Sequence, residues 1–340
     1  MAFSNRKDPM STAQQKTLED YIQLQNRNAL AHAIRAGVEL GVISELKNGQ
    51  RTVEQLATTL KVYPEALRRL MDVLVSSELI EQYGEDFALS PIARLIPDRF
   101  YDLGDEHWQH LAFHVRTGAP LPVCEEVPLN DVDYFTNKSS EEWTLTPTAL
   151  MAAQVLDMGT SRRGTRILEI GCGSAVFGAT LAHLDADSVI TLVDDKIGLE
   201  RAKQTIKSVE LEQKTTYLEC ESLEQLELVE ALKGQTFNLV LIAGLIHRMT
   251  SDACQRLFTK LQPLVKPGGE LAIVDIFPGQ DKGSLQRSIF ELELGLRTSQ
   301  GKLHDPHVLE ENLKEAGFGQ VQFAHLPAAP NYWGLILAQR

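Results

Sequence analysis

The chain has 340 residues, enough for two domains, and its 43% apolar and 23% charged content is typical of globular proteins with a sizeable core. Acidic residues outnumber basic ones by 46 to 33, and the net charge of −13 disfavours nonspecific binding to nucleic acid or anionic membranes. We find no apolar run long enough to span a bilayer and no apolar secretory segment at the amino terminus, so we expect a cytoplasmic protein.

The first hundred residues contain a tail followed by a small helical module. Residues 1–15 are polar and without periodicity, which predicts a flexible tail. A helical pattern then runs to Gly49, Thr52 and Gln55 form a capping-box pair, and Pro64 stands where the first residue of a helix favours proline. A short hairpin around Gly84 follows. Helices followed by a hairpin predict a winged-helix module over residues 16–100.

The sequence pattern of the remaining chain changes near residue 159. Residues 101–158 are expected to be a mostly helical connector, and residues 159–340 alternate between apolar strands and helices. Alternation of this kind predicts a mostly parallel, doubly wound α/β sheet. The expected strands are Arg166–Ile170, Val189–Asp194, Thr216–Glu219, Phe237–Ile242, Glu270–Asp275, Val321–Ala324 and Trp333–Ala338.

The strongest chemical signal follows the first of these strands. Gly171 and Gly173 form a glycine turn that lets the backbone approach a ligand, and the next helix offers free N–H groups. Asp194 ends the second strand, where its carboxylate can accept hydrogen bonds from both hydroxyls of a ribose. We therefore predict a site for a cofactor that carries a nucleoside.

The glycine pattern discriminates between cofactors. A dinucleotide fingerprint would place a third glycine at position 176, but Val176 is there. Glu169 before the glycine turn and the Lys266–Gly269 turn before an apolar strand resemble motifs of class I S-adenosylmethionine-dependent methyltransferases.

Several further segments resemble one family among these enzymes, the winged-helix small-molecule O-methyltransferases. This family includes plant caffeate-type enzymes and bacterial enzymes that modify polyketides and carotenoids. The segments that carry the resemblance are Phe87–Leu95, Val115–Gly118, Ile190–Lys203, Leu239–His247 and Leu313–Phe318. Together they span the chain from about residue 20 to its end, and the chain is identified as a member of this family.

The resemblance implies a fold and a mechanism. We expect a Rossmann-like methyltransferase domain with a seven-stranded sheet, and an amino-terminal winged-helix domain that forms a homodimer. S-adenosyl-L-methionine is the implied cofactor and a small hydroxylated molecule the implied acceptor. The implied catalytic residues are His247, as general base, and Asp275, which would orient it. The implied cofactor-binding residues are Glu169, Gly171, Gly173, Asp194, Glu221 and Ala243. The connector would line the acceptor pocket with Trp108, His114, Trp143 and Met151.

Three positions depart from the family pattern. Ala175 stands where the family usually has glycine, and Glu221 is followed by Ser222 rather than by an aromatic residue. The base is commonly followed by an acid and an aromatic residue, but His247 is followed by Arg248 and Met249. The last departure leaves open a reaction at nitrogen or carbon, or a member of the fold that does not methylate.

Two other functions, metal binding and DNA binding, have weaker support in the sequence. His107, His110 and His114 share one helical face, but no cysteine or carboxylate has partner spacing, so we expect no metal. The four cysteines show no CxxC pattern either. A winged helix can also read DNA in a ligand-sensing regulator, but this module has no basic footprint.

Overall fold

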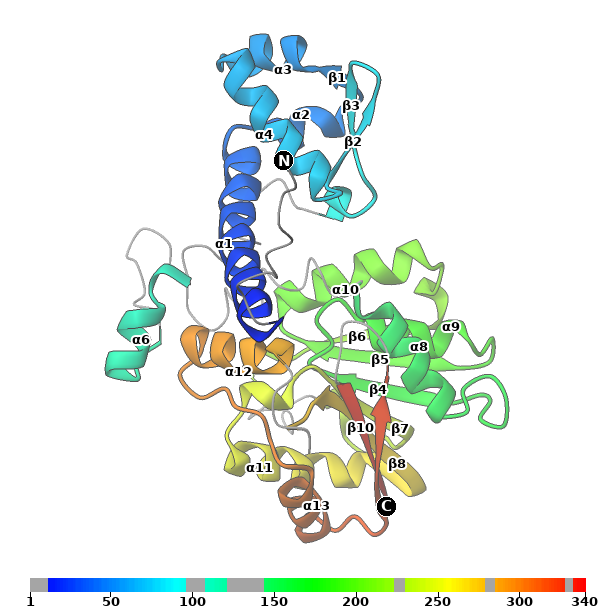
Figure 1. Cartoon of the computed structure of the whole chain (residues 1–340). Helices are drawn as coiled ribbons and strands as arrows, with labels where there is room; N and C mark the ends of the chain where they lie inside the picture. Colours follow the sequence, from blue (N-terminus) through cyan, green and yellow to red (C-terminus); the bar gives the residue numbers. More distant parts are fainter. Residues whose placement is uncertain (1–11, 96–107, 121–143, 223–229, 279–284, 328–332) are drawn as a thin grey trace, which may run out of the picture. The chain divides into compact units, whose positions relative to one another are not determined.

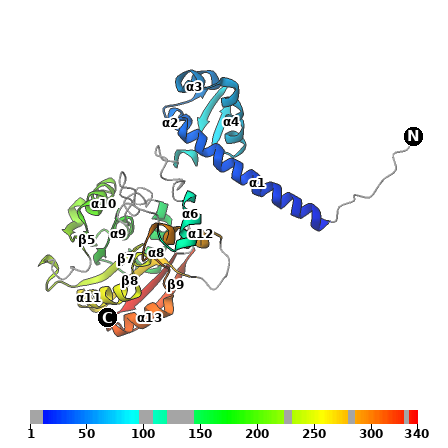
Figure 2. The same cartoon turned by 90° about the vertical axis from the view of Figure 1, so that its left-hand side faces the viewer.

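The computed structural model describes residues 12–95, 108–120, 144–222, 230–278, 285–327 and 333–340. The chain forms two compact units, residues 1–108 and residues 109–340 (Figure 1 and, after a 90° rotation, Figure 2). No helix among the described residues is both long and apolar enough to cross a membrane.

The first unit packs short helices against a small antiparallel sheet. Its sheet has the order β1-β3-β2, and a buried apolar cluster fills the space between the sheet and the helices. The elements are α1 (Thr12–Glu39), α2 (Val42–Lys47), β1 (Arg51–Thr52), α3 (Val53–Leu60), α4 (Pro64–Ser76), β2 (Ile80–Tyr83), β3 (Asp86–Leu89) and the 3-10 turn η1 (Ala93–Leu95).

Local signals in this unit are confirmed with two corrections. Thr52 and Gln55 exchange both bonds of a capping box, and Pro64 opens α4. The helical segment predicted to run to Gly49 is instead broken at Gly41, whose φ of 83° ends α1 and starts α2. The tail prediction is wrong for residues 12–15, which belong to α1 because alanine and glutamine are good helix formers. Residues 1–11 lie outside the described part of the chain.

The second unit is built on a seven-stranded sheet, as predicted. The strand order is β6-β5-β4-β7-β8-β10-β9, and β10 runs in the direction opposite to the other six strands. The strands are β4 (Arg166–Ile170), β5 (Val189–Asp194), β6 (Thr215–Glu219), β7 (Phe237–Ala243), β8 (Val265–Ile276), β9 (Val321–Leu326) and β10 (Trp333–Gln339).

The turn predicted at Lys266–Gly269 lies inside β8, which begins five residues earlier than expected. Pairing between β7 and β8 slips at this point, because Phe237 faces Val265 but Leu239 already faces Glu270. A Cβ at Gly269 would lie 2.8 Å from the Asn238 carbonyl oxygen, so the close backbone approach requires glycine.

Helices cover both faces of this sheet. Alternating residues of each strand enter two separate apolar clusters, as with Ile167 on one face and Leu168 on the other. The helices described in this unit are α6 (Leu111–Thr117), α8 (Thr146–Val155), α9 (Val176–His183), α10 (Lys196–Ser208), α11 (Ser251–Leu261), α12 (Leu285–Arg297) and α13 (Pro306–Glu315). The described part of this unit also contains the 3-10 turns η4 (Glu212–Lys214), η6 (Glu230–Leu232), η7 (Ile246–Arg248) and η8 (Gln262–Leu264).

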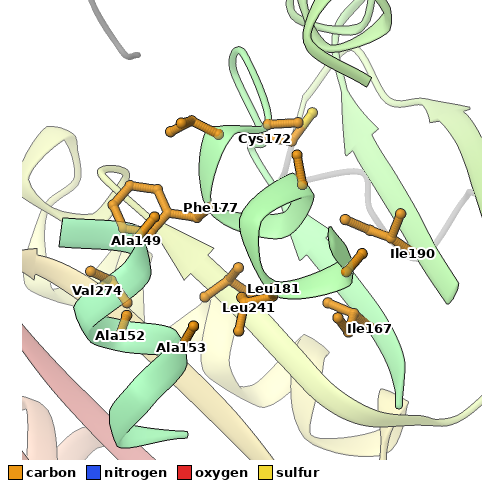
Figure 3. Packing of buried hydrophobic residues seen from close by; sticks show 14 of the residues in the cluster. Ala149, Ala152, Ala153, Ile167, Cys172, Phe177, Leu181, Ile190, Leu241 and Val274 are labelled. Atoms are coloured by element: carbon orange, nitrogen blue, oxygen red, sulfur yellow. The ribbon is translucent and has the colours of Figure 1, made fainter. Parts of the chain in front are cut away.

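The core on one face brings α8 against α9 and the sheet. Figure 3 shows Ala149, Ala152 and Ala153 of α8 facing Phe177 and Leu181 of α9, with strand residues packed alongside. Alanines on α8 allow the two helices to approach closely, and this packing fixes the helix that follows the glycine turn. The opposite face is covered by α11 and α13.

Candidate active site

The predicted site residues of the second unit gather at one edge of the sheet. Strands β6, β5, β4, β7 and β8 are parallel neighbours, so their carboxyl ends meet there. Along this edge lie, in order, Glu221, Asp194, the Gly171–Gly173 turn, Ala243 and Asp275. The cofactor residues thus occupy the β6–β7 side and the catalytic pair the β7–β8 side.

The glycine turn requires glycine at both predicted positions. Gly171 and Gly173 have φ values of 65° and 53°, in the left-handed region that other residues enter only with strain. A Cβ at Gly171 would also lie 2.9 Å from a methyl carbon of Leu245. The turn therefore presents bare backbone at the sheet edge.

Asp194 is held by backbone donors. The N–H of Gly173 donates to Oδ2 at 2.7 Å, and the N–H of Asp195 donates to Oδ1 at 2.8 Å. Each oxygen of a carboxylate has a second lone pair, so both can still accept ribose hydroxyls. Burial raises the pKa of Asp194 above its usual value, while these donors and the charge of Arg248 act in the opposite direction.

Gly198, which sequence reasoning missed, makes room for this carboxylate. A Cβ at Gly198 on α10 would lie 2.4 Å from the Asp194 Cγ. Asp195 starts the same helix, because its side chain accepts the Gly198 N–H at 2.8 Å. The sequence shows a helix start after β5, but only the fold shows which helical position must stay small.

Glu169 contacts the helix that follows the glycine turn. Its side chain is buried, and Oε2 accepts the N–H of Gly178 in the first turn of α9 at 3.2 Å. A carboxylate is favourable at a helix amino terminus. Its predicted contact with the cofactor stays a prediction, as do those of Glu221, which is exposed, and Ala243, which is half-buried.

His247 and Asp275 form a buried pair. His247 lies in η7, directly beyond β7, and its Nδ1 is 2.7 Å from Asp275 Oδ1. Asp275 Oδ2 accepts the backbone N–H of His247 at 3.3 Å. The side chains of His247 and Asp275 are 9% and 1% exposed. Because a carboxylate accepts, we assign the proton of this contact to Nδ1, and in a neutral ring the lone pair then lies on Nε2.

The predicted acceptor-pocket residues are placed only in part. Met151 on α8 packs against the same apolar cluster as Phe290 of α12, whose ring lies 5.5 Å from the His247 ring. His114 on α6 bonds the Ala119 carbonyl, and a Cβ at Gly295 of α12 would be 3.4 Å from its Nε2. Trp108 is half-buried and belongs to the first unit, and Trp143 lies outside the described residues. Sequence reasoning missed Phe290, which lies in no recognised motif.

The departures from the family pattern have local consequences. Ala175 has φ 59° and ψ 25°, a left-handed conformation that strains alanine and suits glycine. Arg248 is half-exposed, and its charge opposes the rise in the pKa of Asp194 that burial causes. No group of three metal-ligating side chains occurs within the described residues, and His107 lies outside them.

Comparison with known families matches both units. Residues 22–97 match the O-methyltransferase dimerisation domain, and residues 161–323 match a methyltransferase domain. The chain is therefore a methyltransferase of class I architecture. With both domains in one chain, it belongs to the O-methyltransferases that carry this dimerisation domain.

Individual relatives are distant. The chain is 24% identical to the mitomycin biosynthesis 6-O-methyltransferase of Streptomyces lavendulae, over 72% of this chain and 73% of that protein. It is 31% identical to the N,N-dimethyltransferase OxyT of Streptomyces rimosus over 30% of either chain. The fold is similar to that of human N-acetylserotonin methyltransferase in complex with S-adenosylmethionine, with a TM-score of 0.71, 19% identity and coverage of 98% and 99% of the two chains.

The residues at the sheet edge fit this cofactor. A glycine turn without a Cβ and a carboxylate with free acceptor capacity are what a nucleoside with a short polar tail needs. Val176 opens α9 where a dinucleotide site would have its third glycine, so a pyrophosphate would meet a side chain there.

Proposed function

We propose that this enzyme transfers a methyl group to a hydroxyl of a small aromatic or enolic acceptor, with His247 as the general base. The observation that carries the proposal is the 2.7 Å contact between His247 Nδ1 and Asp275 Oδ1 beside the cofactor edge. Gly171, Gly173 and Asp194 would hold the cofactor. When bound, S-adenosylmethionine would supply a methyl group on a positively charged sulfur; the acceptor oxygen would bond to the methyl carbon, the S–C bond would break to leave a neutral thioether, and the base would take the hydroxyl proton.

The buried pair suits proton removal from a hydroxyl. A phenol with a pKa near 10 is almost fully protonated at neutral pH, so a base must take its proton during attack. Asp275 holds Nδ1–H, which leaves Nε2 as the basic atom and stabilises the imidazolium once the proton arrives. The Phe290 ring at the edge of His247 supports an apolar, aromatic acceptor.

A panel of phenols, enols, amines and carbon acids tests the proposed reaction. Each acceptor is incubated with S-adenosylmethionine carrying a ¹³C methyl group, and the methylated atom is identified by NMR. We expect labelled methyl on oxygen. Label found only on nitrogen or carbon would contradict the proposal, and label on nitrogen would favour the alternative that the similarity to the N,N-dimethyltransferase OxyT suggests.

We also propose that the enzyme is a homodimer joined through its amino-terminal unit. Leu18, Tyr21 and Ile22 are 48%, 57% and 45% exposed on α1, and their spacing places them on one face of the helix. Exposed apolar residues grouped in this way are typical of interfaces. In the full-length protein, Ile22→Glu is expected to lower the mass measured by light scattering toward that of a monomer.

The matched control for this experiment is Gln23→Glu, which adds the same charge on the opposite face of α1 and should leave the dimer intact. A dimer that persists in Ile22→Glu would place the interface elsewhere. The expectation that the module binds no DNA is tested separately, by titration with duplex DNA at physiological salt. Tight, sequence-dependent binding would favour a ligand-sensing regulator.

A further inference from the structure

The segment between α12 and α13 is bonded to the turn that carries His247. The backbone N–H of Lys302 donates to the His247 carbonyl oxygen at 2.8 Å. His304 Nε2 lies 2.9 Å from the Ile246 carbonyl oxygen and 3.0 Å from that of Met249. This segment is the trace that joins α12 to α13 in Figure 1. Three carbonyls around the proposed base are therefore held by residues more than fifty positions away.

The state of the His304 ring follows from these partners. Carbonyl oxygens only accept, so Nε2 carries the proton and donates to both. The ring is 3% exposed, and burial lowers its pKa below the usual value, which keeps it neutral at physiological pH. A buried neutral imidazole with one shared proton acts here as a fixed donor.

Nearby Cys254 does not compete for this role. Its Sγ lies 3.8 Å from His304 Nε2 and 3.9 Å from the Ile246 carbonyl oxygen, distances of weak contacts only. Burial raises the pKa of the Cys254 thiol to about 12, so it stays protonated. The stronger bonds to the turn come from Lys302 and His304.

The segment itself is anchored at its start. Thr298 Oγ1 accepts the Gly301 N–H at 3.0 Å and donates to the Leu294 carbonyl at the end of α12. A Cβ at Gly301 would lie 2.3 Å from Thr298 Oγ1, so the fold needs glycine there. The donors to the His247 turn are thus carried by a braced segment.

We propose that His304 is a positioning residue that fixes the proposed base through its backbone. Asp275 forms hydrogen bonds with the ring and the backbone N–H of His247. His304 and Lys302 donate hydrogen bonds to backbone carbonyls of the turn that contains His247. This inference rests on the proposed function, because it assigns His304 a role only if His247 acts as base. It predicts an effect on turnover and none on cofactor binding.

Two substitutions of His304 distinguish the effect of its N–H donor from the effect of its side-chain volume. His304→Leu removes the donor and keeps a comparable apolar volume, whereas His304→Gln places an amide N–H the same number of bonds from the backbone. At saturating cofactor and acceptor, we expect kcat to fall roughly ten- to a hundred-fold in His304→Leu, because small displacements of a catalytic group have effects of that size. His304→Gln, which keeps an N–H donor, should keep most of the wild-type kcat. His307→Ala, an exposed histidine three positions away, is the matched control.

Hydrogen exchange gives a readout that does not depend on turnover. In the cofactor-free protein, amides of residues 246–250 should exchange faster in His304→Leu than in wild type, while amides of β4 and β5 stay protected. The S-adenosylmethionine Kd from calorimetry should stay within about two-fold in all three variants. If His304→Leu does not fold, the comparison of His304→Gln with Thr298→Val, which loosens the segment from its far end, takes its place.

A double variant separates this inference from the proposed function. If His304 acts through His247, adding His304→Leu to His247→Ala should cause no further fall in kcat. Full additivity would overturn the positioning role, as would a wild-type kcat in His304→Leu alone. If His247→Ala itself keeps wild-type turnover, the proposed base fails instead, and the exchange result still reports whether His304 holds the turn.

Discussion

The glycine turn after β4 and the His247 turn after β7 lie side by side at the same sheet edge, but their backbones are used in opposite ways. At Gly171–Gly173 the backbone itself forms the proposed binding surface, and the N–H of Gly173 donates to the Asp194 carboxylate from the next strand. At η7 the side chain of His247 carries the proposed chemistry, and the backbone carbonyls are tied down by Lys302 and His304.

Binding a ligand with the backbone and orienting one catalytic side chain place different requirements on the sequence. Backbone binding needs small residues within one short motif, so it is encoded locally. Orientation of one side chain needs contacts from several directions, and these come from β8, α12 and the segment before α13. The cofactor side should therefore respond to changes in the glycine turn and in Asp194 on the adjacent strand, and the catalytic side to changes far along the chain.

The largest expected effect is on the catalytic side. Asp275→Asn keeps the shape of the side chain but removes the charge that holds Nδ1–H and stabilises the imidazolium, so kcat should fall roughly 10²- to 10⁴-fold. The S-adenosylmethionine Kd should stay near wild type. Steady-state kinetics and calorimetry check this, with the exposed Asp252→Asn as control. Equal losses in kcat and in cofactor affinity would contradict the assignment of Asp275 to catalysis rather than to cofactor binding.

On the cofactor side, Asp194→Ala should weaken S-adenosylmethionine binding ten-fold or more. The variant loses a charged acceptor for ribose hydroxyls, and such hydrogen bonds contribute roughly 1.5–3 kcal/mol. Calorimetry of this variant beside Asp187→Ala, an exposed aspartate just before the start of β5, measures the effect. Unchanged affinity in Asp194→Ala, or tight NAD binding by the wild type, would refute the assignment.

A pH effect should distinguish the segment that holds the His247 turn. Burial lowers the pKa of His304, so its folded value lies below the unfolded value near 6.5. The folded protein then binds fewer protons, and this contribution to stability, complete above the unfolded pKa, is lost as pH falls from there through the folded pKa. Urea unfolding of wild type between pH 7 and pH 5 should show this loss, and His304→Gln should show less of it. Parallel pH profiles would mean that other groups cause the change.

The smallest expected effect is at Ala175. A left-handed conformation costs alanine about 1–2 kcal/mol, but glycine loses more entropy on folding, so Ala175→Gly should stabilise by at most about 1 kcal/mol. Ala179→Gly in the right-handed interior of α9 is the opposite case and should destabilise by about 1 kcal/mol or more. Denaturant unfolding of the two variants should give changes of opposite sign.

The same division explains which features the sequence could predict. The seven strands, the capping box at Thr52 and the glycine turn depend on neighbours a few positions apart, and all are found. Phe290 and His304 belong to no motif, and their importance arises only when the chain folds back on η7. The link between His247 and Asp275, 28 positions apart, came from family resemblance rather than from local pattern.

The most direct test of the account is the turnover of His247→Ala on an acceptor that wild type methylates at oxygen. Single-turnover rates at saturating cofactor and acceptor isolate the chemical step, and calorimetry gives the cofactor Kd of the same preparation. If His247 is the base, the rate falls roughly 10²- to 10⁴-fold while the cofactor Kd stays near wild type. A variant that keeps more than about a third of the wild-type rate would contradict the account, because the acceptor would then lose its proton without this histidine.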